Sequence, residues 1–134
     1  MALADGCEIV REWLATSGTT LYTLCATRIS TPVAPNGFSN TQAAIIFHQE
    51  AGRGESDPNV SDDVYVFKCY GGSAQYSDAR NVFRKLYDRL HTKSGDTASD
   101  GGIVDAYCVA QTMAGPEPDT GWPVHISKFR IRIR

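Results

Sequence analysis

The side chains best suited to acid–base or nucleophilic chemistry are three histidines and four cysteines, spread widely along the chain. His48 and His125 lie in strand-like segments and His91 follows a helical one, without the spacing of metal ligands. Cys108 and His125 could meet across neighbouring strands as nucleophile and base, but nothing else marks that role, and a core thiol is our interpretation. The glycine-containing segments GRGES and GGSAQ lack the lysine of a phosphate loop. We therefore expect no catalytic, metal or cofactor site and no enzymatic activity.

The cysteines and the overall composition limit the class of protein to which this chain can belong. The four cysteines are Cys7, Cys25, Cys69 and Cys108. They form no CxxC pair and no Cys–His cluster, which predicts reduced, buried thiols. The first residues lack the features of a signal peptide and no apolar run has transmembrane length, so we expect no membrane partner. With 134 residues, 42% of them hydrophobic, the chain is expected to form one domain, residues 1–134.

The most regular pattern of charged side chains lies in the final segment, KFRIRIR. In a strand, alternate side chains point to opposite faces, so the Phe and Ile residues share one face. The other face carries four cations, named here the basic stripe: Lys128, Arg130, Arg132 and Arg134. These charges stand about 6.6 Å apart and repel unless water, carboxylates or phosphates lie opposite. Upstream, Val124 and Ile126 alternate in the other phase, which predicts a β-bulge near Ser127.

Acidic residues cluster between Glu50 and Asp63. This segment holds five acids and one base, a charge of −4, whereas the last ten residues carry +4. An acidic loop and a basic strand on one subunit suit head-to-tail contact with a neighbouring copy. An equally open alternative is that the stripe only solvates the wet face of a sheet. The residues that we predict at a subunit or tube interface are Arg53, Glu55, Asp57, Asp62, Asp63, Lys128, Arg130, Arg132 and Arg134.

The elements that position these charges are strands interrupted by two helices. Apolar residues at three- and four-residue steps predict helices over residues 7–14 and 79–90. Strand-like runs occupy residues 43–50, 64–70, 103–113 and 124–134, with a brief strand at TRIS. The polar residues 51–63 predict a protruding hairpin loop. We therefore expect an α+β fold: an antiparallel sheet of four to five strands, two α-helices packed on one face, and a long β-hairpin loop.

Several stretches together resemble one family of virion proteins. They are the N-terminal helix with TRIS and its following proline, AAIIFHQEAGRGES, DVYVFKCYGGSAQYSDARNVFRKLYDRL and EPDTGWPVHISKFRIRIR, and they span nearly the whole chain. Their order and spacing resemble the tail proteins of long-tailed bacteriophages called tail terminator, tail completion or minor tail proteins. The segment 93–102 departs from that pattern because it is longer and more polar.

The resemblance implies a structural role. Proteins of this kind form a ring, commonly a homohexamer, in the neck region at the head-proximal end of the tail tube. The ring ends tube polymerisation and takes part in head–tail joining. The implied partners are further copies of the chain, the tail tube protein and the head–tail connector or stopper protein. DNA is implied only as cargo passing through the lumen, and assembly would take place in the host cytoplasm.

Two other functions stay open. A head–tail adaptor or stopper neck protein would share the small size and ring symmetry. A small nucleic-acid-binding domain would bind phosphates through the basic stripe. The net charge of −2 argues against that second alternative, as does the lack of an aromatic platform or a groove-reading helix.

Overall fold

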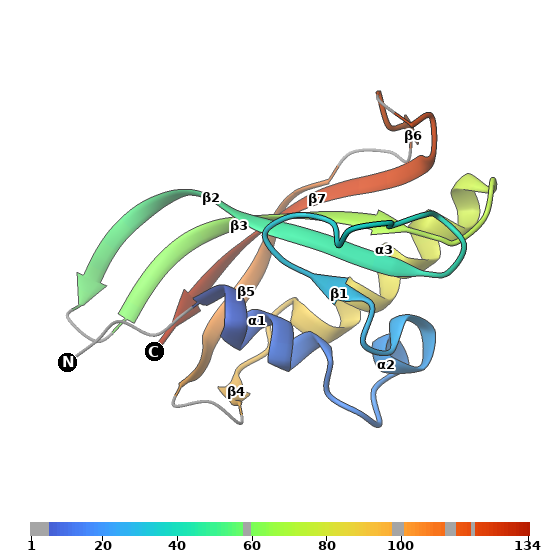
Figure 1. Ribbon diagram of the computed structural model, residues 1–134. Helices are drawn as coiled ribbons and strands as arrows, with labels where there is room; N and C mark the ends of the chain where they lie inside the picture. Colours follow the sequence, from blue (N-terminus) through green and yellow to red (C-terminus); the bar gives the residue numbers. More distant parts are fainter. Residues whose placement is uncertain (1–5, 58–59, 98–100, 112–114, 119) are drawn as a thin grey trace.

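The described residues fold into a curled sheet with three helices, which confirms the α+β class (Figure 1). The computed structural model describes residues 6–57, 60–97, 101–111, 115–118 and 120–134, with backbone alone for 51–57 and 111. The helices are α1 (Gly6–Leu14), α2 (Thr20–Cys25) and α3 (Tyr76–Leu90). The strands are β1 (Ile29–Ser30), β2 (Ala44–Asp57), β3 (Val60–Tyr70), β4 (Gly95–Asp96), β5 (Gly102–Gln111), β6 (Gly115–Pro116) and β7 (Pro123–Ile133).

The strands that the structure describes form one seven-stranded sheet in the order β1-β2-β3-β7-β5-β4, with β6 paired to β7. β1 runs parallel to β2, and every other pairing between described strands is antiparallel. The expected four to five strands and two helices are therefore too few. β1, β4 and β6 have two residues each and α2 has six. β1 lies within TRIS, so the brief strand predicted there is confirmed. β4 and β6 were not predicted, because they are too short to show a 2.0-residue period in the sequence.

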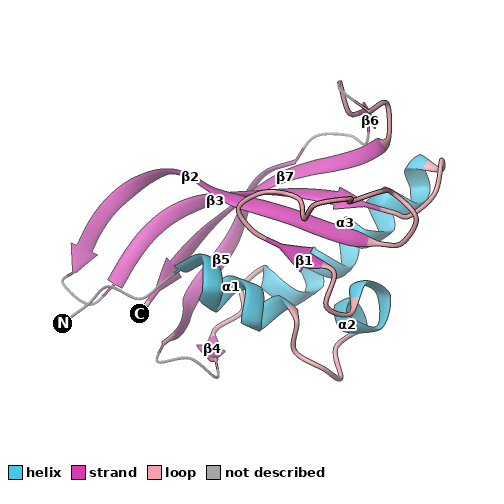
Figure 2. Ribbon diagram, in the orientation of Figure 1, coloured by secondary structure: helices cyan, strands magenta, loops and turns pink. Residues whose placement is uncertain are grey.

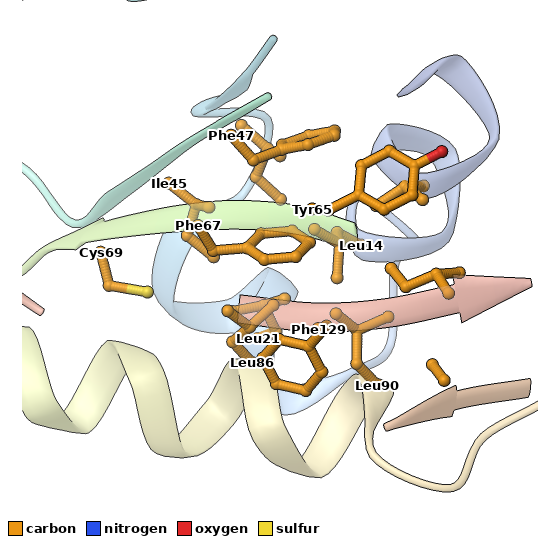
Figure 3. Packing of buried hydrophobic residues seen from close by; sticks show 14 of the residues in the cluster. Leu14, Leu21, Ile45, Phe47, Tyr65, Phe67, Cys69, Leu86, Leu90 and Phe129 are labelled. Atoms are coloured by element: carbon orange, nitrogen blue, oxygen red, sulfur yellow. The ribbon is translucent and has the colours of Figure 1, made fainter. Parts of the chain in front are cut away.

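All three helices cover one face of the sheet (Figure 2). On α3, the residues at three- and four-residue steps (Ala79, Val82, Phe83, Leu86 and Leu90) are buried. They meet the core side chains of the central strands, where Phe67 stacks on Phe47 at 5.1 Å and meets the edge of Phe129 at 5.5 Å (Figure 3). The predicted placement of the helices on a single face is confirmed, because the apolar stripe of α3 has its counterpart in the core side chains of β2, β3 and β7.

The first and third helices are joined by a reciprocal contact between Trp13 and Arg89. The Trp13 Nε1–H donates to the Arg89 carbonyl at 2.9 Å, and Arg89 Nε donates to the Trp13 carbonyl at 3.0 Å. The guanidinium carbon lies 3.8 Å from the indole centroid, a cation–π contact. Burial lowers the pKa of Arg89. This pair fixes α1 against α3 on the helical side of the sheet.

The hairpin of β2 and β3 is longer than the sequence predicts. Strand pairing runs from Ala44↔Tyr70 to Asp57↔Val60, with register shifts after Gln49. The part beyond Gln49, residues 50–57 and 60–63, is named here the β2–β3 arm, and it extends past the helices (Figure 1). The expected polar loop over residues 51–63 is therefore wrong for its described residues, which are strand. Outside the body of the subunit a strand need not alternate apolar and polar residues, so the pattern that marks buried strands is missing.

The terminal strand β7 keeps one register along its whole contact with β3. Pairing is continuous from Ser61↔Ile133 to Tyr70↔Val124, so the predicted bulge near Ser127 is wrong. Instead, His125 and Ser127 point into the core and are buried. Val124 and Ile126 share the outer face with the basic stripe. Because polar residues lie on the core face and apolar residues on the outer face of this part of β7, the hydropathy pattern changes phase, although the backbone register does not.

One end of the outer face is covered after all. Phe38, from the loop between β1 and β2, meets Tyr70 at 5.2 Å and Trp122 at 5.8 Å between ring centroids. These rings pack with the apolar residues of the outer face, including Ile46 and Val124. The outer face therefore divides into an apolar end beneath this loop and a charged remainder.

Candidate functional site

The two central cations of the basic stripe reach to opposite sides of β7. Arg130 Nε donates to Asp62 Oδ1 of β3 at 2.8 Å, and its Nη2 donates to the other oxygen. Arg132 Nε lies 2.9 and 3.0 Å from the carboxylate oxygens of Asp105 on β5, and its Nη2 also donates there. These bonds raise the pKa of both guanidiniums. The two pairs link β3, β7 and β5, with Asp62 buried at 5% exposure and both guanidiniums partly exposed.

The outer cations of the stripe are paired in the same way. Lys128 Nζ lies 3.2 Å from Glu50 of β2, and Arg134 is bound to Asp96 of β4. The stripe thus contains four cations with four carboxylate partners and has no formal net charge. The repulsion expected along the row is relieved from within the subunit. An interface role for the stripe stays a prediction, but it is not an unbalanced cationic surface.

The acidic residues of the β2–β3 arm have several environments. Glu50 and Asp62 pair with the stripe, whereas Asp63 lies on the opposite face of β3 and is 7% exposed. The remaining predicted contact residues in β2 have side chains outside the description: Arg53, Glu55 and Asp57. Two of the five acids therefore serve the fold itself, which sequence reasoning did not anticipate.

The structure does not bring Cys108 and His125 together as a nucleophile and base. Cys108 lies opposite Phe129, and its backbone N–H donates to His91 Nδ1 at 3.1 Å. The residue opposite His125 is Cys69. Burial raises the pKa of the Cys69 thiol well above its ordinary value, so it is protonated at neutral pH and poorly nucleophilic. The described part of the chain contains no cluster of His, Cys, Asp or Glu placed to hold a metal.

A pocket lies between β1, β2 and the covering loop. Arg28 lines it, but this side chain donates to the carbonyls of Ala43 at 2.9 Å and Leu24 at 3.0 Å. Its guanidinium therefore holds the backbone in place. Among the described helices, none is long and apolar enough to cross a membrane.

The fold has a counterpart among solved structures. A chain in a structure described as "Virion of native gene transfer agent (GTA) particle" aligns with a TM-score of 0.69. The alignment covers 96% of this chain and 93% of that chain, at 16% sequence identity. No family model and no curated protein matches the sequence. At this level of identity the likeness establishes a shared fold along almost the full length of both chains.

Proposed function

We propose that this protein is a structural component of a virion. The observation that carries the proposal is the fold likeness over 96% of the chain to a protein of a gene transfer agent virion. The sequence resemblance to phage tail proteins supports the same role independently, since it rests on motifs and their order. The role requires binding surfaces and no catalytic activity, and we propose that the protein has none.

Within the virion, we place the protein in a ring at the head-proximal end of the tail tube, as a tail terminator or completion protein. The ring would stop tube growth and receive the head connector, while DNA passes through its lumen. Its partners would be further copies of itself, the tube protein and the connector or stopper. A head–tail adaptor or stopper is the alternative, because its subunits would present the same kind of ring.

The nucleic-acid-binding alternative loses its main support from the geometry of the stripe. Arg130 and Arg132 each hold a carboxylate through more than one hydrogen bond. A phosphate would have to displace these carboxylates, which are fixed on neighbouring strands of the same sheet. Without an excess of positive charge, the stripe lacks the salt-dependent attraction that drives nonspecific DNA binding.

The direct test is to locate the protein in an intact particle. Tagged protein imaged by cryo-electron microscopy should appear as a ring between head and tail tube. In vitro, the purified chain should limit the length of tubes formed by the tube protein, as measured by negative-stain microscopy. Tubes of unchanged length together with absence from purified particles would contradict the proposal. Density at the head side of a separate terminator ring would favour the adaptor or stopper.

A further inference from the structure

The loop between β1 and β2, residues 31–43, contains an exposed Asn-Gly pair, Asn36 and Gly37. They are the central residues of a β-turn, which Phe38 closes by donating its N–H to the Pro35 carbonyl at 3.1 Å. Gly37 has a φ of +75°, the left-handed value that a type II turn requires at this position. The turn therefore requires this glycine, and a glycine leaves its own backbone nitrogen unshielded by a side chain.

The side chain of Asn36 can react with the backbone that follows it. The Gly37 nitrogen attacks the side-chain carbonyl carbon of Asn36, so that an N–Cγ bond forms and the Cγ–Nδ2 bond breaks. The amide leaves as ammonia with the proton of the Gly37 nitrogen, and a cyclic imide remains. Water then opens this ring at either carbonyl, which leaves aspartate or isoaspartate at position 36. The reaction needs no partner other than water, because both reacting groups belong to adjacent residues.

The surroundings of Asn36 allow both reacting groups to move. Within the described part of the chain, neither the Asn36 side-chain amide nor the Gly37 N–H has a hydrogen-bond partner. A Cβ added to Gly37 would have no heavy atom within 4 Å, so the peptide between the two residues has room to rotate toward the side-chain carbon. Both residues are exposed and line the pocket beside the loop, where water reaches them. The site therefore permits both the attack and the opening of the ring.

The two other asparagines among the described residues lack these features. The Asn40 side chain is held at both ends, since its Nδ2 donates to the Ser73 carbonyl at 3.0 Å and its Oδ1 accepts from the Gly72 N–H at 2.8 Å. Asn81 lies inside α3, where backbone N–H groups are bound within the helix. Each is followed by a β-branched residue, whose side chain crowds the backbone nitrogen. The fold therefore protects these two positions and leaves Asn36 open to reaction.

We propose that Asn36 is a site of spontaneous deamidation and that the reaction loosens the loop between β1 and β2. Isoaspartate adds a carbon atom to the main chain, which breaks the geometry of the turn that Phe38 closes. Phe38 then loses its ring contacts with Tyr70 and Trp122, and the apolar end of the outer face is uncovered. Either product also adds a negative charge to the loop. The inference does not depend on the proposed function, but in a virion, whose subunits are not renewed, the modification would accumulate as the particle ages.

The first test compares asparagines within the unmodified full-length chain. Purified protein is incubated at neutral and mildly alkaline pH and digested in acid, and mass spectrometry follows the exchange of each side-chain amide for a carboxyl group. The modified fraction at Asn36 should grow at least about tenfold faster than at Asn40 or Asn81. The rate at Asn36 should rise with pH, because the attack requires loss of the proton on the Gly37 nitrogen. Equal rates at the three asparagines, or an unmodified Asn36, would overturn the inference.

The second test asks whether the reaction releases Phe38, with Asn36→Gln as the matched control. Glutamine keeps the amide, but its longer side chain requires a larger ring and should react far more slowly. Chymotrypsin, which cleaves after aromatic residues, should cut the incubated unmodified protein after Phe38 several-fold faster than fresh protein, whereas incubated and fresh Asn36→Gln should be cut alike. Equal cleavage of fresh protein and of incubated protein rich in isoaspartate would overturn the loosening. If Asn36→Gln does not fold, the comparison of incubated with fresh unmodified protein decides alone.

Discussion

His125 is a buried titratable group that should make folding sensitive to mild acid. Its side chain is 3% exposed, its ring stacks on Phe83 at 4.2 Å, and its Nδ1 has no hydrogen-bond partner among the described residues. Burial lowers the pKa of His125 below its ordinary value of 6.5, and the charge of Arg80 lowers it further. His125→Phe keeps an aromatic ring beside Phe83 and removes the titration.

The direction of the effect follows from proton binding in the two states. Because the pKa of His125 is lower in the folded state, the unfolded chain binds more protons between the two pKa values. Its contribution to stability is therefore complete above pH of about 6.5 and is lost as the pH falls below that value. One proton corresponds to at most about 1.4 kcal/mol per pH unit. Between pH 7.5 and 5.5, the unmodified protein should lose up to about 1.4 kcal/mol more than His125→Phe.

The free energy of unfolding is measured by urea denaturation at a series of pH values, followed by far-ultraviolet circular dichroism. Surface carboxylates titrate in both proteins, so the difference between the two curves isolates His125. His48→Gln serves as the control because it leaves His125 in place and should keep the slope of the unmodified protein. Parallel curves for the unmodified protein and His125→Phe would refute the reasoning, even if His125→Phe changes stability at every pH.

Three further predictions concern the packing of α3, a buried hydroxyl and the basic stripe. Leu86→Ala should lower the free energy of unfolding by about 2–5 kcal/mol, because Leu86 is fully buried on the side of α3 that faces the sheet. Arg84→Ala, at an exposed position of the same helix, should lower it by less than about 0.5 kcal/mol. Equal losses in urea denaturation would mean that α3 does not cover the sheet. Ser127→Ala should leave stability unchanged or raise it by about 1 kcal/mol, since the buried hydroxyl has no partner among the described residues. A clear loss would reveal a hydrogen bond. Asp105→Arg and Arg132→Asp should each lower the melting temperature, and the double variant should recover more than half of the loss, whereas additive losses would exclude a direct interaction.

Long elements with a clear period could be predicted from the sequence. The spacing of the apolar residues in α3 and the apolar run of β3 are regular enough to identify each element and the face that it buries. The same reasoning failed in β7, where His125 and Ser127 occupy core positions. A buried histidine beside Phe83 has the packing of an aromatic residue, but its hydropathy is that of a surface residue. Hydropathy alternation therefore assigned the wrong phase to half of that strand.

The partners of the basic stripe could not be predicted, since they depend on strand order and register. Arg132 is separated from Asp105 by 27 positions in the sequence, and Lys128 from Glu50 by 78. The alternation of charged and apolar residues in β7 shows that the cations share a face. It does not show which strands lie beside β7 or which carboxylates those strands carry.

The position of β7 in the sheet has a consequence for biosynthesis. It is the last described strand to leave the ribosome, yet it joins β3 to β5 in the middle of the sheet. A nascent chain that still lacks β7 presents two unsatisfied strand edges and an incomplete core, the features that make partly made proteins prone to misassociation. Its many long-range pairings should also make productive folding slow compared with that of a helical protein of similar length. Each copy of this protein should therefore become competent for assembly only after β7 has been translated. We expect the sheet to form in a single step at that point and not gradually during synthesis.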